Sequence, residues 1–324
     1  MTAELFTPVC ENLARWIAGP PPERPPGRSE EDWDRFREAA RVHGVAPLLW
    51  MRVRDLPDWA GSPIGDWLRD QHQWNRCRVV RLQTEIIAIL AAFAAAGVPI
   101  LPVKGAVLST TIYEEPAARP MADIDVLLPA EHQEAGEAVL IGLGYEKVFN
   151  GWKHARFVRP GAVEVADAER EHPDNPRNLE VHPRCRERIR DEVVDLTDLI
   201  WGTAHQGELL GVRTLLPDSD AAWLHLLVHA THHVLLNTLR LIQLVDLVRL
   251  APAVRDPEGL TGSVDPRAVY PALALLGRYF PDERWTGLRE PLRSRLDPSF
   301  STWADGIDLF TVCYLNPVPW RAEP

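Results

Sequence analysis

Two aspartates separated by one residue, Asp123 and Asp125, open an apolar run that ends at Leu128. This pattern predicts a strand, and residues i and i+2 of a strand point to the same face. Two like charges side by side are costly unless a cation lies between them. The pair therefore predicts a divalent-cation site on one face of a strand, and removing both charges is expected to relieve repulsion in the cation-free protein.

A Lys-Gly turn precedes the two acids. Lys104 and Gly105 follow a short apolar strand, and Ala106 to Tyr113 then has the character of a short helix. A lysine at a strand-to-helix turn is typical of a phosphate contact, because it supplies a point charge beside free backbone N–H groups. Arg119 supplies a second cation near the acids, or pairs with a neighbouring glutamate. Acids and turn together are what a site for a divalent metal and a nucleotide phosphate requires.

A third acid would complete a two-metal site. Glu180 and His182 lie two residues apart in a short apolar stretch, so both are predicted on one face of a strand. Three carboxylates of this kind can hold two magnesium ions ~3.5–4 Å apart, which clamp the attacking and leaving oxygens of a phosphoryl or nucleotidyl transfer. Glu164 and Asp167 lie in another possible strand and are rivals for the third position.

The rest of the chain is mainly helical by pattern. Helices are expected at 3–18, 29–43, 66–95, 130–143, 221–233 and 239–250, with further helical segments from 266 to 310. Strands are expected at 100–103, 124–128, 145–149, 153–158 and 179–182, with Asn150-Gly151 as a hairpin turn and a loop at 166–177. The fold class is therefore α+β, a small mixed-sheet core flanked by helical segments. We predict an N-terminal helical segment at 1–98, the α/β core at 99–184 and a C-terminal helical domain at 185–324.

Composition excludes several classes of protein. The formal net charge is -11 with no long basic run, which argues against a general DNA or RNA binder. The four cysteines are scattered, which favours reduced thiols over a disulfide framework or a zinc ribbon. No signal peptide is apparent, and the most apolar stretch, Ile86 to Ile100, is too short to span a membrane. We therefore expect a cytoplasmic protein that binds neither membrane nor DNA.

The stretch from Lys104 to Leu128 resembles an uncharacterised bacterial nucleotidyltransferase family of the polymerase-beta-like superfamily. Other stretches are similar to that family too: Gly144-Tyr145, Leu179 to His182, and the helical runs from His225 to His233 and from Leu239 to Leu247. The resemblance implies a nucleotidyltransferase core that moves a nucleoside monophosphate from a nucleoside triphosphate (NTP) to an acceptor hydroxyl or phosphate, with two Mg²⁺ ions.

The resemblance also implies a role for each residue in the motif. Asp123, Asp125 and Glu180 would bind metal and carry the catalysis, while Lys104, Gly105, Ser109, Arg119 and His182 would contact the nucleotide. The superfamily holds the terminal phosphates with a Gly-Ser turn. This chain has Ala106 where that serine stands, so the charge of Lys104, or the hydroxyl of Ser109 one turn later, is expected to replace it.

Three alternatives remain open at this stage. His225, His229 and His232 share one helix face by their i, i+4, i+7 spacing, so a His-rich metal hydrolase is conceivable, although packing between helices is the simpler interpretation. The missing serine would suit a non-catalytic nucleotide-binding descendant. A toxin-like enzyme that modifies protein or transfer RNA is the third. The acidic net charge favours a small-molecule acceptor over RNA or protein, and no motif names that acceptor or the base of the NTP.

Overall fold

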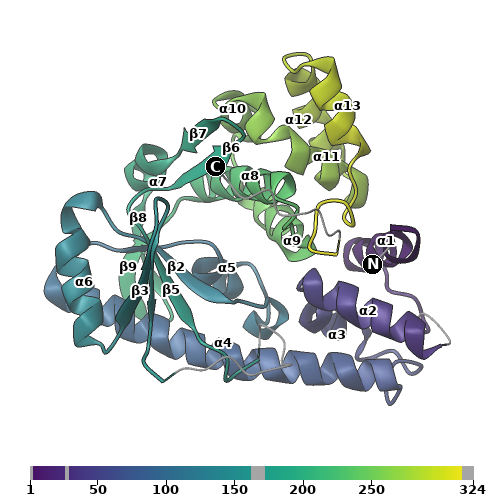
Figure 1. The fold of residues 1–324 in the computed structure, drawn as a ribbon, viewed down its shortest axis with the longest axis horizontal. Coiled ribbons are helices and arrows are strands. Elements are labelled where there is room, and N and C mark those ends of the chain that lie inside the picture. The colour runs from purple at the N-terminus through teal and green to yellow at the C-terminus, as the bar shows by residue number, and fades with distance from the viewer. Residues whose placement is uncertain (1–2, 26–28, 162–171, 316–324) are drawn as a thin grey trace. The chain divides into compact units, whose positions relative to one another are not determined.

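The computed structural model describes residues 3–25, 29–161 and 172–315. The chain divides into two compact units (Figure 1). The first unit comprises Met1–Leu68, Glu187–Val194 and Leu226–Pro324, and the second comprises Arg69–Arg186 and Asp195–His225. The three-part division with boundaries after residues 98 and 184 stays a prediction. The candidate acids Glu164 and Asp167 lie outside the described residues, as does the first half (166–171) of the loop predicted at 166–177.

The first unit is mainly helical. Its helices are α1 (Ala3–Ala18), α2 (Glu30–Val42), α3 (Ala46–Val53), α9 (Leu241–Leu250), α10 (Pro257–Gly262), α11 (Tyr270–Tyr279), α12 (Glu283–Arg293) and α13 (Pro298–Gly306), with 3-10 turns η3 (Ala251–Ala253) and η4 (Pro266–Ala268). The predicted start of α2 is confirmed, because the Ser29 hydroxyl accepts a hydrogen bond from the Asp32 N–H at 3.2 Å. Four elements run from one unit into the other: α4 (Pro63–Ala96), α8 (Ser219–Leu235), β6 (Arg186–Ile189) and β7 (Glu192–Asp195).

A buried histidine joins three segments of the first unit. His43 follows α2, and its Nδ1 accepts the backbone N–H of Leu241 at 3.3 Å, at the start of α9. Its Nε2–H points to the Cys10 sulfur at 3.4 Å. Complete burial and the nearby Arg240 guanidinium lower the pKa of His43 to about 3. The imidazole is therefore neutral in the folded protein at neutral pH.

This histidine should make the first unit acid-sensitive. Folding lowers the pKa of His43. Its contribution to the free energy of unfolding is therefore fully present above the unfolded pKa of 6.5 and is lost as the pH falls toward the folded pKa of about 3. At 1.36 kcal/mol per pH unit, we expect about 3 kcal/mol to be lost between pH 6.5 and pH 4. Denaturant unfolding of wild type and His43→Gln across this range measures the loss. Parallel curves for the two proteins would contradict this assignment.

The second unit contains the five-stranded mixed sheet and its covering helices. The strands are β1 (Leu101–Pro102), β2 (Asp123–Leu127), β3 (Glu146–Asn150), β4 (Ala155–Val158) and β5 (Asn178–His182), in the order β1-β2-β5-β4-β3. β2 and β5 are parallel, and the other neighbours are antiparallel. Smaller elements are α5 (Gly105–Thr111), η1 (Pro116–Ala118), η2 (Ala130–His132), α6 (Gln133–Gly142), α7 (Thr197–Thr203), β8 (His205–Leu209) and β9 (Val212–Leu216). The α+β class predicted from the sequence is confirmed.

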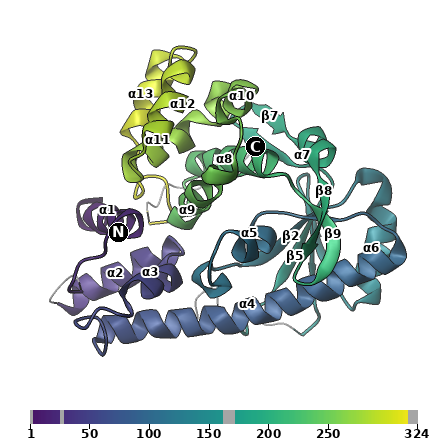
Figure 2. The same cartoon turned by 180° about the vertical axis from the view of Figure 1, so that it is seen from behind.

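The long helix α4 covers the apolar face of this sheet (Figures 1 and 2). Its buried positions Leu82, Ile86, Leu90 and Phe93 belong to one core cluster with the inward side chains of the strands, namely Ile124, Val126, Phe157, Leu179 and Val181. Two other apolar positions of the same helical pattern are exposed, Val80 at 55% and Ile87 at 39%. The opposite face of β2 and β5 is thereby left to the polar residues of the strands, because strand side chains alternate.

Helix α4 is also the one helix of the described chain whose length and hydropathy would allow it to cross a membrane. Within its most apolar window 39% is buried inside the structure. Such a helix is weak evidence for a membrane span, because a core helix passes the same test. The core residues that α4 contributes to the sheet account for its apolar character.

Candidate active site

The polar face of the sheet brings the three predicted acids together. The parallel register of β2 and β5 sets Asp123 opposite Asn178 and Asp125 opposite Glu180. Side chains at paired positions of neighbouring strands point to the same face. Asp123, Asp125, Glu180 and His182 therefore share one face, as their i, i+2 spacing predicted. The shared face depends on a parallel pairing between segments more than fifty residues apart.

Asp125 is the most strongly bound of these acids. Its Oδ1 accepts hydrogen bonds from the Lys104 ammonium at 2.8 Å and from His182 Nε2–H at 2.9 Å. Burial opposes ionisation of Asp125, but Lys104 and His182 outweigh it and hold the pKa of this carboxyl well below its usual range. The acid pair was predicted to need a cation beside it, and the Lys104 ammonium is such a cation. Relief of repulsion on removing both charges stays a prediction, and the Lys104 pair opposes it because Asp125 already has a cationic partner.

The pKa of Glu180 is shifted in the opposite direction from that of Asp125. Burial and the charges of Asp125 and Asp123 raise the pKa of the Glu180 carboxyl to about 8. Its two oxygens lie 3.5 Å from His154 Nε2 and 3.7 Å from His182 Nε2. Both imidazoles are neutral at pH 7, since burial lowers the pKa of His182 and that of His154 falls to about 4. The charges of Lys104 and Lys153 favour the ionised form of Glu180, but burial and the two aspartates outweigh them.

His154 is the site residue that the sequence analysis missed. The β3–β4 hairpin was predicted, but its turn comprises residues 151–154, and Asn150 is already paired with Ala155. Because Ala155 pairs with Val181, the register sets His154 beside His182, with ring centroids 5.2 Å apart. The Asn150-Gly151 dipeptide predicted the hairpin, but the prediction placed the turn one residue too early, because Asn150 is still part of β3.

The Lys104-Gly105 turn lies next to the acids. Lys104 adopts φ +51° and ψ -130°, a sparsely populated conformation for a residue with a side chain. Gly105 is closely approached, because a Cβ there would lie 2.6 Å from the Arg119 guanidinium and 2.9 Å from the Met121 sulfur, so both side chains would have to shift for a larger residue. Arg119 is thus placed against this turn and is buried. Ser109 is also buried, and its hydroxyl has no hydrogen-bond partner among the described residues.

The residues of this face fit a divalent cation. Asp123, Asp125 and Glu180 offer the hard oxygen donors that Mg²⁺ prefers, from two strands that are fixed in register. The third acid is strongly disfavoured as a carboxylate without further positive charge. A cation on this face would remove that penalty. Lys104 would then have to share or leave Asp125.

Three histidines of α8 form a hydrogen-bonded cluster in the first unit, namely His229, His232 and His233. His229 Nδ1–H donates to Glu187 at 2.6 Å, and His229 Nε2 accepts from His233 Nε2–H at 3.1 Å. His233 Nδ1 accepts the Thr238 hydroxyl at 2.6 Å, and His232 Nδ1–H donates to the Arg188 carbonyl at 2.7 Å. Each ring nitrogen named above is thus hydrogen-bonded to another group of the protein. This cluster therefore supports the packing interpretation over a metal hydrolase.

We expect His229→Ala to destabilise the protein more than it slows the chemical step. The substitution leaves the buried Glu187 carboxylate short of a donor, which costs about 1–3 kcal/mol. Denaturant unfolding and turnover of the same preparation give the two quantities, with His232→Ala as a second variant. A bound transition metal that disappears with either substitution would instead support the hydrolase.

The chain belongs to the family described as uncharacterised nucleotidyltransferase, whose model matches residues 29–268. Membership makes it a transferase of nucleotidyl groups. No curated protein sequence matches the chain significantly.

The chain also matches solved structures, at low sequence identity and with low TM-scores. The solution structure of the antibiotic-resistance factor ANT(2'')-Ia has 17% identity and a TM-score of 0.40, over 67% of this chain and 93% of that one. Its crystal structure with adenylyl-2''-tobramycin gives the same identity and TM-score over 66% of this chain and 98% of that one. An antigenic nucleotidyltransferase-like protein from Paracoccidioides brasiliensis has 13% identity and a TM-score of 0.36, over 72% and 97% of the two chains.

Proposed function

We propose that this protein transfers a nucleoside monophosphate from an NTP to the hydroxyl of a small-molecule acceptor, in the cytoplasm and with Mg²⁺. The observation that carries the proposal is the register of β2 on β5, which sets Asp125 beside Glu180 on the polar face. The acidic net charge of -11 supports a small acceptor, because RNA binding depends on phosphate neutralisation by basic residues.

Each residue of the face has a role in this reaction. Two Mg²⁺ ions held by Asp123, Asp125 and Glu180 would neutralise phosphate charge and lower the pKa of the acceptor hydroxyl. With a cation bound beside it, Glu180 would be ionised and would take the proton as the acceptor oxygen bonds to the α-phosphorus and the bond to the β-phosphate oxygen breaks. Lys104 and Arg119 offset the charge that develops on the departing pyrophosphate. His182 orients Asp125 through its 2.9 Å hydrogen bond.

Incubation of the protein with each α-³²P-labelled NTP, Mg²⁺ and an extract of small metabolites tests the proposal. Label that moves to a small molecule, with release of pyrophosphate, supports it. Label on RNA or protein would support the toxin-like alternative. No transfer from any NTP, with the Asp123→Asn variant as the inactive reference, would refute the proposed function.

One contact favours a second candidate, a nucleotide-binding protein without turnover. The Lys104 ammonium lies 2.8 Å from Asp125, where a metal ion would otherwise bind, and both side chains are nearly buried at 12% and 7% exposure. An internal cation of this kind can satisfy the acid without metal. Saturable NTP binding in the absence of any transfer would support this candidate.

Lys104→Ala should show whether Lys104 binds the terminal phosphates of the nucleotide or contributes to nucleotide binding in general. A charge-assisted hydrogen bond is worth about 1.5–3 kcal/mol, so we expect triphosphate affinity to fall by about tenfold or more while monophosphate affinity barely changes. Calorimetric titration of both ligands with Mg²⁺ present measures this. Lys104→Arg is the matched control that keeps the charge. Equal losses for the two ligands would show that Lys104 does not hold the leaving phosphates.

A further inference from the structure

We infer that His154, Glu180 and His182 form a nitrogen-containing site for one divalent transition-metal ion, of the Zn²⁺ or Mn²⁺ class, beside the acid pair. One ligand atom from each residue lies within 4.8 Å of the others. The inference rests on the proposed metal-dependent transfer at the same face. It differs from that proposal in the ion and in the use of two imidazoles.

The separations of the donor atoms suit a single small ion. His154 Nε2 and His182 Nε2 lie 3.5 and 3.7 Å from the two Glu180 oxygens. Metal–nitrogen bonds of ~2.0–2.1 Å in tetrahedral geometry place neighbouring ligand atoms ~3.4 Å apart. Each imidazole thus lies within a few tenths of an ångström of that separation from one Glu180 oxygen. One donor atom of each residue lies within 4.8 Å of the others, so side-chain rotation has to bring the three donors onto one ion.

Two of the three donors lie on a strand. Glu180 and His182 occupy i and i+2 of the central strand β5, and strand positions hold their geometry better than loop positions. His154 is the last residue of the β3–β4 turn, and the pairing of β4 with β5 places it beside His182. The three side chains are mostly but not wholly covered, at 22%, 19% and 5% exposure for His154, Glu180 and His182. An ion could thus enter the site and still be shielded.

The donor chemistry selects against Mg²⁺ at this position. Imidazole nitrogens suit Zn²⁺ and its neighbours, whereas Mg²⁺ is bound by oxygens. Asp125 would supply a fourth donor, because its Oδ1 is already 2.9 Å from His182 Nε2 and an ion would replace the proton between them. An N₂O₂ set of this kind leaves Asp123 and a second Asp125 oxygen for an oxygen-bound ion with the nucleotide.

Metal titration of the metal-free, full-length protein tests this site directly. We expect one Co²⁺ per chain with the visible ligand-field spectrum of a nitrogen-containing set, and ¹⁴N couplings in pulsed electron paramagnetic resonance of the Mn²⁺-loaded wild type. His154→Ala should weaken Co²⁺ binding by tenfold or more and change the spectrum. His154→Gln is the second variant, with circular dichroism to verify the fold. His205→Ala, an exposed histidine on β8, is the matched control and should change neither.

Two results would overturn the site. The first is a wild-type protein that binds no Co²⁺ or shows no nitrogen coupling. The second is binding that survives His154→Ala and is lost in His229→Ala, which would move the ion to the α8 cluster. The transfer assay is run on wild type alone, so the proposals separate. Histidine-dependent Co²⁺ binding without transfer keeps the site and refutes the transferase proposal, and Mg²⁺-supported transfer without Co²⁺ binding does the reverse.

Discussion

The double substitution Asp123→Asn, Asp125→Asn is expected to reduce nucleotidyl transfer by about 10³-fold or more. Both carboxylates lie on the face of β2 that we propose to bind metal, and metal ions at a phosphoryl centre supply several kcal/mol of transition-state stabilisation. About 4 kcal/mol corresponds to this factor. Initial rates of pyrophosphate release at saturating NTP and Mg²⁺ measure it. Turnover of the double mutant within tenfold of wild type would show that the metal assignment is wrong.

The two single substitutions should differ in stability. Asp125→Asn leaves the nearly buried Lys104 ammonium without its carboxylate, and breaking a buried pair costs about 3–5 kcal/mol, less here because asparagine still accepts a hydrogen bond. Asp123→Asn leaves that pair intact and is the matched control. We expect a lower unfolding midpoint for Asp125→Asn alone, although both variants lose transfer. Equal midpoints would argue that Lys104 does not depend on Asp125.

The predictable parts of this fold are those with a strong local signal. Helix α4 was predicted because its apolar residues repeat at helical spacing, and α2 because Ser29 and three acids mark its start. Strand β2 was predicted from its apolar run, and the Asp123-x-Asp125 spacing then gave the shared face. In each case the deciding residues lie within one turn or one strand of each other.

Two hairpins escaped prediction for a physical reason. The β8–β9 turn uses Leu210 at φ +53° and Gly211 at φ +81°, and Arg190 at φ +57° follows β6 in the same way. Tight hairpin turns of this kind favour Asn-Gly or Asp-Gly, because few other residues tolerate positive φ. Leu210 and Arg190 are not typical turn residues, so the sequence at these positions does not indicate a turn. Tertiary packing, with Leu209 in the core of the second unit, compensates for the local strain.

The contacts within the site were beyond local reasoning. The sequence predicted which acids face one way, but the Lys104–Asp125 pair joins residues from two elements, and His154 reaches Glu180 only through the register of β4 on β5. Pairing between distant strands is set by the whole core, and no short window of sequence records it. The same limit applies to Arg78.

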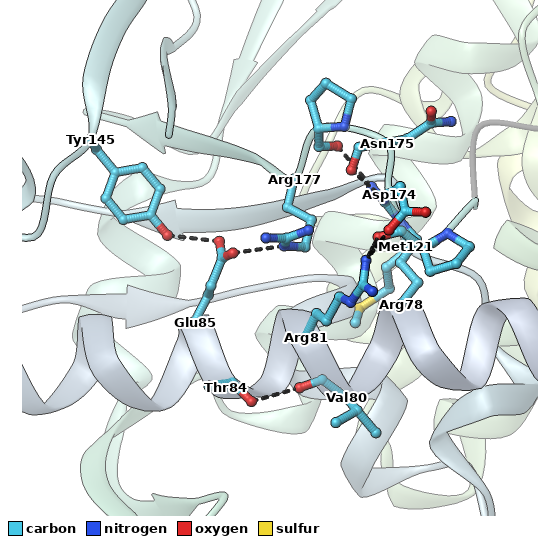
Figure 3. A network of polar contacts seen from close by, with 12 residues as sticks. Arg78, Val80, Arg81, Thr84, Glu85, Met121, Tyr145, Asp174, Asn175 and Arg177 are labelled. Atoms are coloured by element: carbon cyan, nitrogen blue, oxygen red, sulfur yellow. Dashed lines mark hydrogen bonds and ion pairs between the residues drawn. The ribbon is translucent and has the colours of Figure 1, made fainter. Parts of the chain in front are cut away.

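Arg78 on α4 joins the two segments that lead into the acid-bearing strands (Figure 3). Its buried guanidinium donates to the carbonyls of Met121 and Ala122, at 2.8 and 2.6 Å, just before Asp123. It also donates to the carbonyls of His172, Asn175 and Pro176, at 3.1, 3.0 and 3.0 Å, ahead of β5. All five N–H donors of the side chain are thus used on backbone acceptors.

We expect Arg78→Met to lower the free energy of unfolding by about 4 kcal/mol or more. Each hydrogen bond from a charged donor is worth about 1.5–3 kcal/mol, and the loss leaves buried carbonyls short of partners. Arg81→Met, one turn along α4, is the matched control. Its ion pair with Asp174 is exposed at 46% and 60%, and such pairs are worth at most about 1 kcal/mol.

Arg78→Lys tests whether the guanidinium also positions the site. A lysine keeps the charge but offers three donors from one point, so it cannot span both segments. Hydrogen exchange should therefore rise at residues 121–125 and 175–180 in the folded variant, and transfer should fall at temperatures where circular dichroism shows the native fold. Unchanged hydrogen exchange at both segments would mean that other contacts of the sheet align Asp125 with Glu180. So would a free energy of unfolding of Arg78→Met that lies within about 1 kcal/mol of that of Arg81→Met, since an exposed ion pair is worth no more than this.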